Sequence, residues 1–113
     1  MRKLTLAIAA ASAALLLFAA AGVEAQEAAY NLSIRDHRFS PAQIEMPANT
    51  KVRLVIRNED ASPEEFDSTQ LRREKVIPGG SEATLYIGPL PSGTYEFLGE
   101  FHPETARGRI VVR

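Results

Sequence analysis

The sequence predicts an all-β protein, either an antiparallel β-sandwich or a small barrel. Short runs of alternating apolar and polar residues recur from residue 29 onward, and turn-forming residues separate them. Helical periodicity is hard to find in the same part of the chain. Together these observations favour about seven short strands over a helical or mixed architecture.

The expected strands differ in how clearly the sequence marks them. The clearest is 51–58, KVRLVIRN, where Val52, Leu54 and Ile56 face one way, as in a half-buried strand. Lys51, Arg53 and Arg57 face the other way. Turn signals such as PGGS (78–81) and PLPSG (89–93) separate later strands. The remaining expected strands are 29–34, a short apolar segment within 39–50, 73–77, 83–88, 94–99 and 108–112.

One segment does not fit this strand pattern. Residues 58–71, NEDASPEEFDSTQL, contain five acidic residues and no apolar alternation, so we expect a long irregular loop. In a compact β domain a loop of this kind is more often functional or mobile than merely connecting.

The first 25 residues predict a secretory signal peptide. A short basic start is followed by an almost wholly apolar run, and small residues at positions 23 and 25 favour cleavage after Ala25. The alternative is an uncleaved anchor that tethers the domain, because the apolar run approaches a membrane-spanning length. In either case residues 26–113 are expected to form one exported domain, since no linker or repeat divides them.

Composition excludes several classes of function. The formal net charge is −1, which does not suit a nucleic-acid partner. The sequence has no cysteine, so the domain has neither disulfides nor a thiolate to offer a metal. No serine with a plausible base and no glycine-rich phosphate loop is present, and we therefore expect no enzyme activity.

The acidic segment 58–71 and the segment FLGEFHPETARG (97–108) each follow a core strand. In a sandwich the ends of such strands can meet at one pole, which would bring an imidazole close to several carboxylates. These groups suit iron, manganese, zinc or Cu(II) rather than soft Cu(I). The candidate metal ligands are His102, Glu64, Glu65, Glu100 and Asp67.

Each candidate also has a purely structural interpretation. His102 can be a turn residue hydrogen-bonded to Glu100 or Glu104, and the acidic residues can form a solvated loop. The other histidine, His37, lies among charged residues and is expected to be an exposed strand residue outside the site. The aromatic residues expected in the core are Tyr86, Tyr95, Phe97 and Phe101.

Three stretches of the chain resemble the cupredoxins, a family of small Greek-key β-sandwiches that includes the blue-copper proteins. They are FSPAQIEMPANTKVRLVIRNED (39–60), NEDASPEEF (58–66) and GTYEFLGEFHPETARGRIVV (93–112). The resemblance places His102 in the histidine slot of the family's ligand loop. It also places Glu64, Gly99 and Thr105 in the slots of the other histidine, the cysteine and the methionine. It therefore implies the cupredoxin-like fold without a type 1 copper centre, which needs a thiolate.

The phrases PEEFDS and GEFHPETARG are similar to those of cupredoxin-like periplasmic proteins that accompany bacterial iron uptake, including the Efe-type transporter. This resemblance implies a periplasmic protein that binds an iron or copper ion beside an inner-membrane iron permease. The alternatives are a metal-free interaction module that docks a membrane transporter and, third, a copper electron-transfer protein. A ferroxidase activity stays open if copper binds beside iron.

Overall fold

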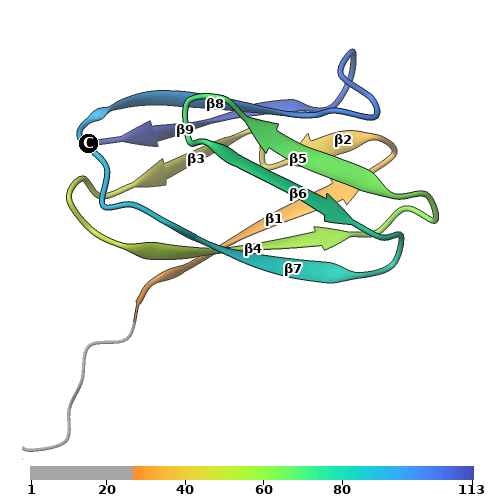
Figure 1. Ribbon diagram of the computed structural model, residues 1–113, viewed down its shortest axis with the longest axis horizontal. Coiled ribbons are helices and arrows are strands. Elements are labelled where there is room, and N and C mark those ends of the chain that lie inside the picture. Colours follow the sequence, from red (N-terminus) through yellow and green to blue (C-terminus); the bar gives the residue numbers. More distant parts are fainter. Residues whose placement is uncertain (1–26) are drawn as a thin grey trace, which may run out of the picture.

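The computed structural model describes residues 27–113, which form a sandwich of two β-sheets (Figure 1). The expected signal peptide, 1–25, lies outside the described residues, as does the residue that would follow cleavage after Ala25. Between residues 27 and 113 there is no helix long and apolar enough to cross a membrane.

The first sheet has the strand order β2-β1-β4-β7. Strand β1 pairs with β4 in parallel, while β1–β2 and β4–β7 are antiparallel. The strands are β1 (Ala29–Arg35), β2 (Arg38–Ser40), β4 (Val52–Asn58) and β7 (Glu82–Ile87).

The second sheet has the order β3-β9-β8-β5-β6. Its β3–β9 pair is parallel and its other pairs are antiparallel. The strands are β3 (Gln43–Met46), β5 (Glu64–Ser68), β6 (Arg73–Ile77), β8 (Gly93–Gly99) and β9 (Arg107–Val112).

The structure confirms the sandwich and corrects two details of the expectation. Both sheets are mixed rather than wholly antiparallel. The expected irregular loop also contains strand β5, in which Glu64, Phe66 and Ser68 are buried and the residues between them are partly exposed. Alternation is present in β5, but two of its three inward residues are polar, so a search for alternating apolar residues does not detect it.

Alternate residues of the strands fill the space between the sheets. On β4, Val52, Leu54 and Ile56 are almost fully buried, as the period of two predicts. Phe97 is buried and Tyr95 packs against the core, but Tyr86 and Phe101 are 49% and 46% exposed. The expectation that these last two belong to the core is therefore wrong: Tyr86 points outward from β7, and Phe101 lies in the turn after β8.

Several connections gather at one end of the sandwich, at the right of Figure 1. They are the β1–β2 turn, the 59–63 connection from β4 to β5, and the 100–106 loop from β8 to β9. The C-terminus and the start of β1 lie toward the opposite end. We call the right-hand end the loop pole, defined by residues 36–37, 59–63 and 100–106.

Candidate metal centre

Glu64 and His102 meet at the loop pole. Glu64 begins β5 with its side chain directed inward, and the distance between its Oε2 atom and Nδ1 of His102 is 2.6 Å. The Glu64 side chain is 2% exposed and that of His102 is 29% exposed, so the pair runs from the interior to the surface. The structure thus brings together the imidazole and one of the four carboxylates that the sequence proposed.

Backbone donors complete the surroundings of the buried carboxylate. Oε1 of Glu64 accepts hydrogen bonds from the N–H groups of Glu65, at 3.0 Å, and Phe101, at 2.8 Å. A buried carboxylate is costly unless it is hydrogen-bonded, and these donors offset that cost. Both oxygens of Glu64 therefore have hydrogen-bond partners, and this fixed carboxylate can hold the His102 ring in place.

This pairing decides which nitrogen of His102 is available. An ionised carboxylate can only accept hydrogen bonds, so a neutral imidazole that faces ionised Glu64 carries its proton on Nδ1 and its lone pair on Nε2. Histidines that bind metals commonly donate their other ring N–H to a carboxylate in this way. The loop supports the ring position, because the His102 N–H donates to the Gly99 carbonyl and the His102 carbonyl accepts from Ala106.

The other proposed ligands lie elsewhere. Glu65 and Asp67 alternate with the buried residues of β5 and so face the outer side of the sheet, away from Glu64. Glu100 lies near them: hydrogen bonding to the Asp67 carboxyl, slight burial and the negative charges of Asp67, Glu65 and Glu74 raise the pKa of Glu100. In residues 27–113 no three histidine, aspartate or glutamate side chains are grouped so that they could hold a metal ion.

Sequence reasoning missed His37. This residue lies in the β1–β2 turn rather than in a strand, and its ring stacks on the ring of His102 with centroids 3.6 Å apart and planes 8° from parallel. The available signal was an Asp-His pair between two alternating runs, which suits a two-residue hairpin turn. The contact with His102 is tertiary and has no local signal.

Asp60 ties the His37 turn to the loop after β4. Its carboxylate accepts hydrogen bonds from the N–H groups of Asp36, at 2.8 Å, and His37, at 3.0 Å. The bond from the His37 N–H is the main cause that lowers the pKa of Asp60, against an opposing effect of burial. Because the folded pKa lies below the unfolded value, this stabilisation is present above the unfolded pKa and is lost as the pH falls through the folded pKa.

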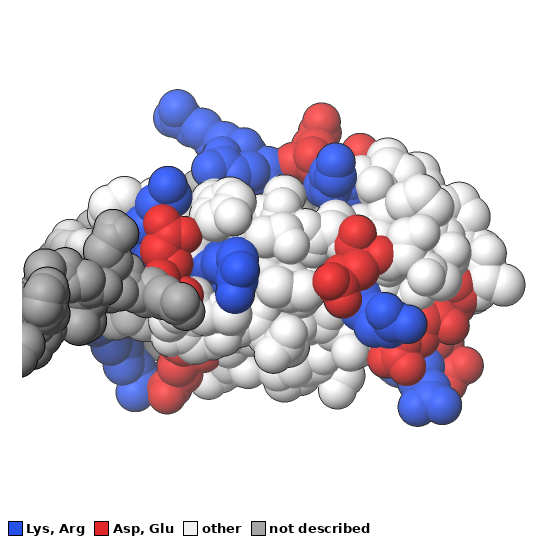
Figure 2. Space-filling model, turned by 90° about the horizontal axis from the view of Figure 1, so that it is seen from below, with Lys and Arg blue, Asp and Glu red and all other residues white. Residues whose placement is uncertain are grey.

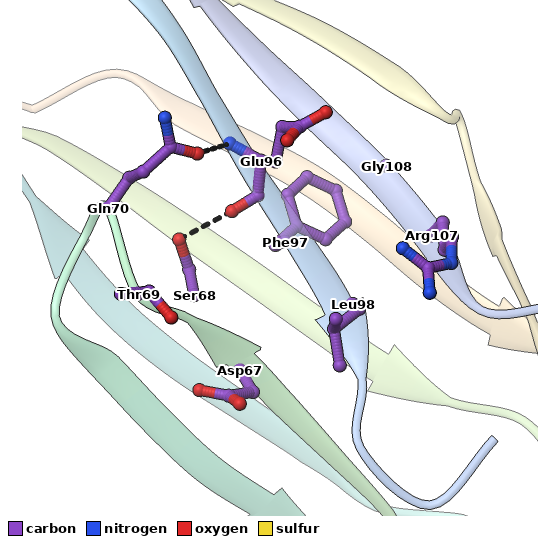
Figure 3. Close-up of a pocket in the computed structure, with 9 residues that line it drawn as sticks. All are labelled: Asp67, Ser68, Thr69, Gln70, Glu96, Phe97, Leu98, Arg107 and Gly108. Atoms are coloured by element: carbon purple, nitrogen blue, oxygen red, sulfur yellow. Dashed lines mark hydrogen bonds between the residues drawn. The ribbon is translucent and has the colours of Figure 1, made fainter. Parts of the chain in front are cut away.

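A groove lies elsewhere, on the side of the sandwich where the turn after β5 meets β8 (Figure 3). It measures about 230 Å³, below the usual 300–1,000 Å³ of small-molecule sites. Ser68 donates to the Glu96 carbonyl and Gln70 accepts from the Glu96 N–H, so the polar groups there hold the turn against the strand. This groove adds nothing to the histidine site.

A match to a family model places the chain in a family. A model of the cupredoxin-like domain matches residues 7–112. The chain belongs to the cupredoxin-like domain family. This cupredoxin-like protein is 43% identical, over 81 residues, to an uncharacterized protein of Rickettsia prowazekii (strain Madrid E). The match takes in 72% of this chain and 65% of the relative, so the chain spans just under two thirds of that relative's length.

Solved structures of copper proteins share the fold. The metal-binding domain of the Cu(I)-exporting P-type ATPase CopA of Streptococcus pneumoniae D39 superimposes with a TM-score of 0.67 at 15% identity, over 75% of this chain and 84% of that one. Auracyanin A, a blue copper protein of Chloroflexus aurantiacus, gives 0.67 at 11% identity, over 78% and 100%. The cupredoxin-like protein is thus related in fold to copper-binding proteins.

Type 1 copper does not fit the residues of this chain. The sequence contains no cysteine, and the resemblance places Gly99 in the cysteine slot. A Cβ atom at Gly99 would come within 2.7 Å of both the Glu64 carboxyl carbon and the Ala106 Cβ. The Glu64 carboxylate therefore fills the space beside Gly99, and any side chain there would need its neighbours to move.

Proposed function

We propose that this cupredoxin-like protein binds an iron or copper ion at the loop pole through Nε2 of His102, with Glu64 as the residue that positions the ring. The observation that carries the proposal is the 2.6 Å contact between Glu64 and His102. It fixes the tautomer with the lone pair on Nε2, and the partly exposed ring is within reach of an ion from solution.

The wider role is that of a carrier. We propose that the protein is exported to the periplasm and passes its ion to an inner-membrane iron permease. The export signal expected in residues 1–25 and the resemblance of PEEFDS and GEFHPETARG to iron-uptake proteins support this role. The ion is then a cargo, which must be released, so an open site with few protein ligands suits the function better than a closed one.

Metal titration of the purified protein tests the site. We expect Cu(II), Fe(II), Fe(III) or Zn(II) to bind with a stoichiometry of about one in calorimetry, since one histidine of known tautomer anchors one ion. His102→Ala should abolish that binding. Glu64→Gln should weaken it by about 10–100-fold, the usual effect of losing the carboxylate behind a ligating histidine.

Glu104→Gln is the matched control, because Glu104 is exposed in the same loop and makes no recorded contact with His102. Its binding should equal that of the wild type. If none of the metals binds, or if His102→Ala binds as the wild type does, the proposed site is wrong. The carrier role is tested separately by growth of a deletion strain in iron-limited medium.

A further inference from the structure

The turn that carries His37 has an unusual backbone. Asp36 and His37 have φ angles of +52° and +59°, the left-handed conformation of a two-residue hairpin turn. Glycine is the favoured residue in the second of these positions, and other residues there are strained. A histidine in that position raises the question of what its side chain does.

Both peptide groups of His37 are held by other parts of the loop pole. Its N–H donates to Asp60, and its carbonyl accepts from Oγ1 of Thr105 at 2.6 Å. Asp60 is fixed in turn, because its N–H donates to Oδ1 of the buried Asn58. The backbone of His37 is therefore anchored to the 59–63 connection and to the 100–106 loop that contains His102, which holds the two rings together.

Unlike its backbone N–H and carbonyl, the ring nitrogens of His37 form no hydrogen bonds within residues 27–113. The residue is partly exposed. In His102, Glu64 contacts Nδ1, and Nε2 has no hydrogen-bond partner within residues 27–113. Two imidazoles with uncommitted nitrogens thus lie in direct contact at the surface.

We infer that His37 is a second nitrogen ligand, so that His37 and His102 together bind one divalent ion of the borderline class, Cu(II) or Zn(II). The inference rests on the His102 site of the proposed function, and of the two metals named there it selects copper, with zinc as a second ion of the same class. Two imidazole nitrogens favour these ions over Fe(III) and Mn(II), which prefer oxygen donors. Glu64 stays outside the coordination sphere in this arrangement.

The stack itself has to change when the ion binds. Two nitrogens on one ion at 2.0–2.1 Å are about 3–3.4 Å apart, so rings in contact are close enough to share it. The lone pairs of parallel rings lie in parallel planes, however, and do not converge, so one ring must tilt to point at the ion. Glu64 holds the ring of His102, whereas His37 is held only through its backbone, so the ring of His37 is the one that turns.

The experiment uses the fact that the sequence contains only two histidines. Zinc is diamagnetic, so ¹⁵N-labelled protein titrated with Zn(II) gives an NMR spectrum of just two imidazole side chains. We expect one nitrogen of each ring to shift as metal-bound nitrogens do. In parallel, Cu(II) should show hyperfine coupling to two imidazole nitrogens in electron paramagnetic resonance.

His37→Asn is the informative variant, because asparagine tolerates the left-handed conformation and the fold should survive. It should bind Cu(II) and Zn(II) at least tenfold more weakly and couple to one nitrogen. His37→Gly, which suits the turn even better, should weaken binding to the same extent while leaving the protein as stable as the wild type or more so.

The outcomes separate this inference from the proposed function. If both variants keep wild-type affinity, or if only the His102 ring shifts with Zn(II), His37 is not a ligand and the His102 site stands. If the wild-type protein binds none of the metals, the proposed function fails and this inference fails with it.

Discussion

Glu64 and Glu65 are identical residues, adjacent in the sequence, on the same strand, and they have opposite environments. Glu64 faces the interior, is 1% exposed, and has both oxygens hydrogen-bonded to His102 and two backbone N–H groups. Glu65 faces the outer side, among Asp67, Glu74 and Glu100, where the negative charges repel one another. The Glu64 carboxylate belongs to the candidate metal centre, and the Glu65 carboxylate belongs to the outer face of the sheet.

The difference comes from the pleat of the strand. Successive side chains of a β-strand point to opposite faces, so a single step along the chain moves a carboxylate from the interior to solvent. A count of acidic residues in the 58–71 segment cannot make this distinction. On the face that Figure 2 shows, which is the underside of the view in Figure 1, acidic and basic side chains are interspersed.

The largest effect should come from removing the inner carboxylate. Glu64→Ala leaves two backbone N–H groups and Nδ1 of His102 without their acceptor, and it opens a cavity in the interior. We expect a loss of about 3–5 kcal/mol in the free energy of unfolding, because each buried donor left without an acceptor costs about 1–3 kcal/mol and the cavity adds to that cost. Denaturation by urea measures it.

Glu65→Ala is the matched control, one residue away on the outer face, and should change the free energy of unfolding by less than about 0.5 kcal/mol. Glu64→Gln keeps an acceptor and most of the volume, so it should fall between the two. Equal stabilities for the two alanine variants would show that the inner and the outer carboxylate contribute equally to the free energy of unfolding, against this prediction.

How much of this contrast could be predicted depends on the residues that face inward. The alternation of Val52, Leu54 and Ile56 predicted β4, because apolar residues fill its first three inward positions, and only the last, Asn58, is polar. Strand β5 was not predicted, because the polar residues Glu64 and Ser68 occupy two of its inward positions. The exception to the hydrophobic pattern coincides with the candidate site, as expected where a functional group is buried.

The site itself was predicted only in part. Placing two strand ends at one pole predicted that His102 would meet an acid from 58–71, and it meets Glu64. The same reasoning placed Glu65, Asp67 and Glu100 in the group, because topology alone carries no information on which face a side chain uses. His37 was missed because its contact with His102 depends on a hairpin turn held by Asp60 and Thr105, which are 23 and 68 residues away in the sequence.

A smaller effect should follow from filling the space beside the inner carboxylate. Gly99→Ala places a Cβ atom within 2.7 Å of the Glu64 carboxyl carbon and the Ala106 Cβ, so both neighbours must shift. We expect a loss of about 1–3 kcal/mol in the free energy of unfolding, typical of overpacking.

The double variant Gly99→Ala/Ala106→Gly removes one of the two close contacts and should recover part of the loss, beyond the separate cost of Ala106→Gly. Thermal unfolding of the four proteins in the cycle measures the coupling. If Gly99→Ala is as stable as the wild type, the pocket around Glu64 is looser than the structure indicates, and the argument that it excludes a cysteine at position 99 fails.

The smallest expected effect is a change in the pKa of one carboxyl group, Glu100, near the outer face of β5. Asp67 is the main cause of the raised pKa of Glu100, through a hydrogen bond and through its charge. Asp67→Asn should therefore lower the pKa of Glu100 toward its ordinary value of 4.5, measured by an NMR pH titration of the side-chain carboxyl. Glu104→Gln is the control, since Glu104 is not among the groups that perturb Glu100, and it should leave the titration unchanged.

The sign for stability is opposite to that of Asp60. A carboxyl whose folded pKa is raised binds its proton more readily in the folded state, so acidification from neutral pH through the raised pKa toward 4.5 relieves a repulsion and stabilises the fold. Asp67→Asn should remove most of that gain, whereas Glu104→Gln should keep it. If Glu100 titrates identically in the wild type and in Asp67→Asn, the outer carboxylates do not interact, and the two faces of β5 differ in burial alone.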